Sequence, residues 1–173
     1  MESLIDKYHL HVFRGPLHVS MKEEIVSLDR AIEESESLHV HANPQPSYDV
    51  MFPLSEALPK EFDLYLLGNH SGFQIDTLSF IEDVVSDESL LLVGVQGIIL
   101  FVTQHPSNMR QEGLILSPAY QYEKRRILSG GRDEAQIPFC FKSENRNTVG
   151  VGYSRFSACE MNAEDAVILI GKI

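Results

Sequence analysis

Residues 8–42, YHLHVFRGPLHVSMKEEIVSLDRAIEESESLHVHA, decide the fold class because their apolar residues change period twice. Residues 8–13 alternate between two sides, which predicts a strand with two different faces. Residues 20–36 place apolar residues three and four apart with acidic residues between them, which predicts a helix with one buried stripe. Residues 38–42 alternate again and predict a second strand, which the prolines that follow bring to an end.

The relation between these two strands has two possible forms. Ser20 and Glu23 have the spacing of a capping box, so we expect the helix to begin at Ser20. If residues 14–16 end the first strand, then strand, helix and strand form a right-handed parallel unit. If Gly15–Pro16 instead turns a hairpin and residues 17–19 return, the relation is antiparallel. The sequence leaves both forms open.

The rest of the chain adds further strands and helices. In the first half we expect a strand at 48–52, a helical turn at 55–58, a buried strand at 62–67, and a helix at 77–85. In the second half we expect a hairpin of 90–95 and 98–103 that turns at Gln96–Gly97, a short strand at 114–116, a helix at 118–128, and an antiparallel meander of strands at 137–142, 148–158 and 166–170. The sequence therefore predicts one α+β domain over residues 1–173, with a mixed or mostly antiparallel sheet that carries two or three amphipathic helices.

Charge divides the chain into two unequal halves. Residues 1–89 hold 17 of the 25 acidic residues and 5 of the 14 basic ones, whereas residues 90–173 are nearly neutral and rich in predicted strands. The net charge of −11 opposes the approach of nucleic acid, so we expect none to bind directly. Lys124–Arg126 hold too few cations to reverse that field, and we expect them to pair with acidic groups of this chain or of a second subunit.

The composition indicates a cytoplasmic protein without a membrane partner. We expect no secretory signal at the N-terminus, and the most apolar stretch, residues 90–102, is shorter than the roughly 20 residues of a membrane span. The two cysteines are Cys140 and Cys159, and we expect buried free thiols rather than a disulfide. A thiol between Phe139 and Phe141 is inert in an apolar strand, so we expect no cysteine nucleophile.

Two His-x-His pairs, His9 with His11 and His39 with His41, are the sharpest chemical feature. Each pair puts two imidazoles on one face of a predicted strand, about 7 Å apart. If the strands are neighbours, four ring nitrogens could hold Zn, Fe or Cu, as in a metal-binding protein or metal-dependent enzyme, or could together sense pH. However, no carboxylate accompanies either pair, and neither a His-Glu-x-x-His nor a Cys-x-x-Cys motif occurs. The simpler interpretation places these histidines on the polar side of half-buried strands.

The acidic residues of the first half form the predicted binding surface. No complete catalytic signature occurs, so we expect a non-catalytic module without a cofactor. Its expected partner is a basic protein such as a nuclease or toxin, held as inhibitors and immunity proteins hold their targets, by analogy of charge and size. The alternatives are an acidic surface that only confers solubility, and a structural or assembly subunit. The predicted binding residues are Glu23, Glu24, Asp29, Glu33, Glu34 and Glu36, followed by Asp83, Asp87 and Glu88.

Overall fold

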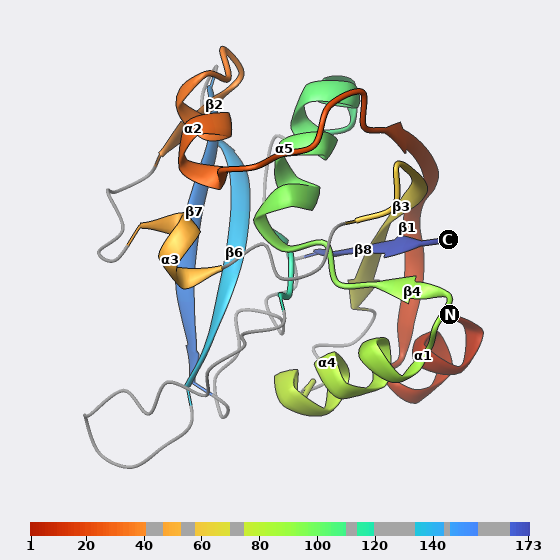
Figure 1. Ribbon diagram of the computed structural model, residues 1–173. Helices are drawn as coiled ribbons and strands as arrows, with labels where there is room; N and C mark the ends of the chain where they lie inside the picture. The colour runs from red at the N-terminus through yellow and green to blue at the C-terminus, as the bar shows by residue number, and fades with distance from the viewer. Residues whose placement is uncertain are drawn as a thin grey trace.

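The computed structural model describes residues 1–40, 47–52, 58–69, 75–109, 114–119, 134–143, 146–155 and 167–173. In this part of the chain the strands form one mixed sheet, and helices pack on both of its faces (Figure 1). The predicted α+β class and mixed sheet are therefore confirmed.

Helices and strands alternate along the chain as far as α5, after which come η1 and the last four described strands. The helices are α1 (Glu2–Lys7), α2 (Leu28–Glu33), α3 (Tyr48–Met51), α4 (Thr77–Ser86), α5 (Gly94–Gln104) and the 3-10 turn η1 (Pro106–Asn108). The strands are β1 (Leu10–Ser20), β2 (Leu38–Val40), β3 (Glu61–Asn69), β4 (Leu90–Leu91), β5 (Ile115–Leu116), β6 (Glu134–Ser143), β7 (Arg146–Arg155) and β8 (Val167–Lys172).

The order of strands across the sheet differs greatly from their order in the chain. The sheet runs β1-β3-β8-β5-β6-β7-β2, and β4 pairs with the end of β8. The pairs β5–β8 and β2–β7 are parallel, and the other pairs are antiparallel. As a result β8 lies in the middle of the sheet, and β1 and β2 lie at its two opposite edges. The first two strands of the chain are therefore neither a hairpin nor a parallel pair.

Each face of the sheet supports its own hydrophobic core, because alternate residues of a strand point to opposite faces. On β8, Val167 and Leu169 belong to the core that packs under α2, α3 and α5, whereas Ile168 and Ile170 belong to the core under α1 and α4. β8 is consequently apolar on both faces, as expected for a strand covered by helices on both sides.

Helix α5 occupies the stretch for which the sequence predicted a hairpin, and that prediction is wrong. Its residues from Gly94 to Val102 are all buried, so no polar face marks the helical period. A short apolar run is compatible with either a buried strand or a buried helix. Gly97 is not a turn residue: a β-carbon added there would stand 2.3 Å from Cγ2 of Val93, so glycine allows residues 97 and 93 to approach closely.

No helix in the described part of the chain is long and apolar enough to cross a membrane.

Three further expectations are corrected. β1 runs through Gly15–Pro16 to Ser20 with irregular register, so no capping box forms there and α2 begins at Leu28 instead. Residues 48–51 form helix α3 rather than a strand. The late strands are not one meander, because β6 and β7 form an antiparallel hairpin whereas β8 pairs with β3 and β5. Long-range pairing decided these positions, and local patterns do not encode it.

Other expectations agree with the structure or fall outside what it describes. β3 and α4 lie where a buried strand and a helix were predicted, and Phe80, Ile81 and Val84 of α4 are buried. Val85 of the same helix is, in contrast, 54% exposed. The central residues of the turn at 55–58 and nearly all of the helix at 118–128 lie outside the described residues.

Candidate partner-binding surface

Helix α2 is held by a cap and by two buried side chains. The Oγ atom of Ser27 accepts a hydrogen bond from the backbone N–H of Arg30 at 3.2 Å, which is an N-cap three residues before its donor. Leu28 and Ile32, one turn apart, are 1% and 2% exposed and pack into the core. The predicted apolar stripe is thus correct at these two positions, although the helix is much shorter than expected. Its outer side carries the acidic residues.

Two aspartates join α2 and α3 by capping each other's helix. Asp29 of α2 accepts hydrogen bonds from the backbone N–H groups of Tyr48 and Asp49, at 3.0 and 3.1 Å. Asp49 in turn accepts one from the Ser27 hydroxyl at 2.6 Å and one from the Leu28 N–H at 2.5 Å. Burial works against the charge of Asp29, but these hydrogen bonds outweigh it and hold the pKa of Asp29 below its usual value. The carboxylate of Asp29 therefore stabilises the fold, a role the sequence did not reveal.

The remaining acidic side chains around α2 point to solvent. Glu34 pairs with Arg30, whose Nε lies 2.7 Å from Oε1 of Glu34, in an exposed i,i+4 ion pair. The others form no hydrogen bond or ion pair within the described residues; they are Glu23, Glu24, Glu33 and Glu36. Exposed carboxylates without an internal cation keep their full attraction for an external one.

Two exposed valines lie at the junction of α2 and α3. Val26 is 76% exposed and Val50 is 52% exposed, which is unusual for large apolar side chains. Each is next in sequence to a member of the Ser27–Asp49 hydrogen bond, so the paired caps hold both valines at the α2–α3 junction. The surface around α2 therefore combines apolar side chains with acidic ones. The sequence did not predict that these valines are exposed, because valine more often packs inward.

The second group of predicted binding residues lies around α4, where two of its three acids are used internally. Asp83 Oδ2 accepts hydrogen bonds from the Lys7 ammonium and the Tyr8 hydroxyl, both at 2.5 Å. These two donors lower the pKa of Asp83. They also tie α4 to α1. Glu88 is exposed and has no such partner in the described ranges.

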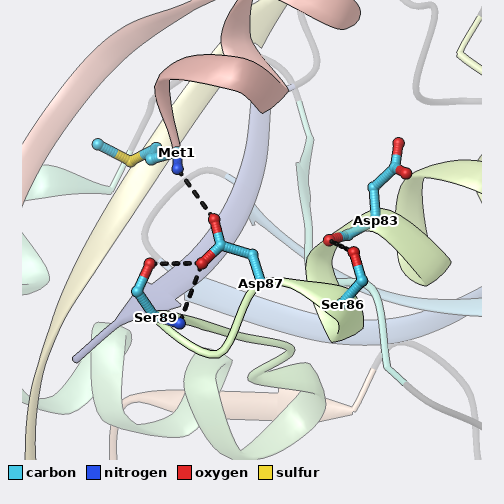
Figure 2. Close-up of polar contacts among 5 residues, drawn as sticks. All are labelled: Met1, Asp83, Ser86, Asp87 and Ser89. Atoms are coloured by element: carbon cyan, nitrogen blue, oxygen red, sulfur yellow. Dashed lines mark hydrogen bonds and ion pairs between the residues drawn. The ribbon is translucent and has the colours of Figure 1, made fainter.

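Asp87 closes the end of α4, as Figure 2 shows. Its carboxylate accepts hydrogen bonds from the hydroxyl and backbone N–H of Ser89, at 2.6 and 3.0 Å, and lies 3.2 Å from the α-amino nitrogen of Met1. The Ser89 hydroxyl contributes most to lowering the pKa of Asp87, to about 2. Nearby, the Ser86 hydroxyl donates to the backbone carbonyl of Asp83 at 2.9 Å. Like Asp83, Asp87 holds α1 and α4 in place.

The structure does not bring the predicted binding residues into one patch. The α2 group covers one face of the sheet and the α4 group covers the other, since the buried residues of the two helices belong to different cores. Figure 1 also shows α2 and α4 far apart in the molecule. Among the residues that the structure describes, only the α2 group has several predicted carboxylates without a hydrogen-bond or ion-pair partner.

His9 and His11 are likewise separated from His39. His9 and His11 lie at β1 and His39 lies on β2, and these strands are at opposite edges of the sheet. The condition for a four-histidine site, that the two strands be neighbours, is not met; His41 lies outside the described residues. Within the residues that the structure describes, no group of three or more His, Cys, Asp or Glu side chains could hold a metal ion.

Cys140 is a buried free thiol on β6 in the core under α5, and burial raises the pKa of its thiol well above the ordinary value. A thiol that stays protonated is a poor nucleophile, as its apolar sequence context predicted. Cys159 and the basic residues 124–126 lie outside the described residues.

No protein-family model, curated protein or solved structure matched the chain.

Proposed function

We propose that this protein is a non-catalytic binding module of the cytoplasm that attaches to a basic surface on another protein through α2 and the segment before it. Inhibitors and immunity proteins act in this way when they cover the cationic site of a nuclease or toxin. The observation that carries the proposal is the exposure of Glu23, Glu24, Glu33 and Glu36, which have no hydrogen-bond or ion-pair partner among the residues that the structure describes.

The rigidity of the surface supports the same function. Residues 27–33 and 48–51 are joined by four hydrogen bonds between Asp29, Asp49 and the two helix starts. A surface that is ordered before binding loses less conformational entropy on contact than a flexible one. Glu33 is thus presented from a preformed junction, and Glu23, Glu24 and Glu36 lie in the segments directly before and after α2.

The exposed valines give this surface a second means of holding a partner. Interfaces between proteins combine a desolvated apolar centre with a polar rim. Val26 and Val50 supply apolar area at the α2–α3 junction, and the glutamates flank that junction in the sequence. In this arrangement the charges would act mainly on the association rate, and the valines on the dissociation rate.

Affinity capture followed by kinetics tests the proposal. The intact protein is immobilised and exposed to an extract of its source cells, and a bound basic protein is identified by mass spectrometry. Its association rate is then measured at increasing salt. We expect the rate to fall steeply, because exposed charges are screened over roughly 10 Å at moderate ionic strength.

A matched pair of charge reversals separates a local surface from net charge. Glu33→Lys with Glu36→Lys changes the α2 surface, whereas Glu82→Lys with Glu88→Lys makes the same charge change at exposed residues of the α4 side. We expect the α2 variant to associate roughly tenfold more slowly than the α4 variant, with similar dissociation. Equal rates for the two variants, or association that salt does not affect, would contradict the proposal.

A further inference from the structure

The two edges of the sheet differ greatly in length. β2 is an edge strand of three residues, whereas β1 is an edge strand of eleven whose one partner among the described strands is β3. A long edge presents unpaired backbone groups, which are a template for a strand of another molecule. The protein must therefore satisfy or block these groups along β1.

Side chains at the end of α5 occupy the outer edge of β1. The side-chain amide of Gln104 accepts from the Ser20 N–H at 3.1 Å and donates to the Ser20 carbonyl at 2.9 Å. The Nε2 atom of His105 lies 2.7 Å from the carbonyl oxygen of His18, to which its N–H donates. His18 and Ser20 are two residues apart, so their outward groups lie along the same edge.

These contacts copy those of a neighbouring strand. A primary amide offers one acceptor and one donor in the geometry of a peptide group, and Gln104 uses both on one residue of β1. Farther along the same strand, the Arg14 guanidinium donates to the side-chain oxygen of Asn108 at 2.6 Å. Pro16, which lies between Arg14 and His18, has no backbone N–H that could pair with another strand. Residues 104–108 thus accompany β1 from Ser20 to Arg14.

We propose that residues 104–108 act as a side-chain latch that keeps β1 from pairing with β1 of a second copy of this chain. Two identical strands can pair antiparallel about a two-fold axis, and the pairing satisfies both copies with the same groups. The only permanently charged side chain of β1 is Arg14, so little charge repulsion opposes that contact. In many proteins, charged side chains keep an exposed edge strand from pairing with another molecule. Here the latch takes the place of such charges.

Removal of the latch tests the proposal in the full-length protein. In the variant Gln104→Ala with His105→Ala, the Ser20 and His18 groups lose their partners. We expect its mass by light scattering to rise toward twice the monomer mass with concentration, while the parent stays monomeric. Hydrogen exchange should show the Ser20 amide protected again in the dimer.

Two further variants keep the test decisive. Gln104→Glu preserves the size of the side chain but cannot donate to the Ser20 carbonyl at neutral pH, so this variant should also dimerise. It provides the test if the double variant unfolds. Ser107→Ala changes an exposed residue of the same turn that makes none of these contacts, and it should behave as the parent does. Folded latch variants that stay monomeric at every concentration, or a parent that already pairs through β1, would overturn the proposal.

Discussion

Replacement of Gly97 by alanine tests how α5 is packed against the sheet. A β-carbon at residue 97 would stand 2.3 Å from Cγ2 and 2.4 Å from Cβ of Val93, distances that real atoms do not occupy. Val93 cannot easily withdraw, because it is 2% exposed and already packs on Gly171, where an added β-carbon would stand 2.8 Å from Cγ1 of Val93. The two glycines thus enclose Val93 from opposite sides.

Two effects of opposite sign determine the size of the change. Alanine is the better helix former, by about 1 kcal/mol. Overpacking of a well-filled core costs about 1–3 kcal/mol, and the enclosed position of Val93 places Gly97→Ala toward the upper end. We therefore expect a net loss of about 1–2 kcal/mol in the free energy of unfolding. For a chain of this size that loss lowers Tm by roughly 2–8 °C.

Urea and thermal unfolding of four proteins measure the effect: the parent, Gly97→Ala, Val93→Ala and the double variant. Val93→Ala removes Cγ2, which lies 2.3 Å from the new β-carbon, but keeps Cβ at 2.4 Å. Part of the overlap is thus relieved, so the double variant should lose less than the sum of the single losses, by up to about 1 kcal/mol. If Gly97→Ala is as stable as the parent, or more stable as helix propensity alone would make it, the packing argument is refuted. Strict additivity would show that the methyl groups of Val93 are not what Gly97 accommodates.

Two further predictions concern the aspartates. In urea unfolding, Asp29→Ala and Asp49→Ala should each lower the free energy of unfolding by about 1 kcal/mol, the usual cost of a lost helix cap. The double variant should lose less than the sum of the two single losses, because either change already loosens the shared junction. Fully additive losses would contradict reciprocal capping. The lowered pKa values of Asp29, Asp83 and Asp87 mean that their stabilisation is present above about pH 4 and is lost as the pH falls toward 2. The urea midpoint should fall over that range, and Asp87→Asn should flatten the slope; an unchanged slope would count against this role.

The fold was predictable where the local pattern had a single structural solution. β3, α4 and the hairpin of β6 and β7 lie close to their expected positions, since alternation or one-sided spacing excludes other forms. α5 was not predictable in this way, because a segment buried on all sides has no polar face to reveal its period. The place of β8 between β3 and β5 was also hidden, because strand order depends on contacts between distant residues.

The candidate site was likewise predictable from the sequence only in part. Composition already indicated that acidic residues gather in the first half of the chain, and that charge is still the basis of the proposed function. Which carboxylates are free depended on where other chain segments lie: Asp29 meets the start of α3, and Asp83 meets Lys7 and Tyr8 of α1. These partners lie 19, 76 and 75 residues away in the sequence.

The sequence by itself therefore determined the fold class, the excess of negative charge and the apolar stripe of α2, because each depends on residue type and on spacing over a few residues. Only the tertiary structure decided that His9 and His11 lie at the edge opposite to His39, that three of the nine predicted acids support the fold, and that Gln104 and His105 bind the outer backbone groups of Ser20 and His18 on β1. Those outcomes depend on which distant segments meet, and hydrogen bonds between distant residues leave no period in the chain.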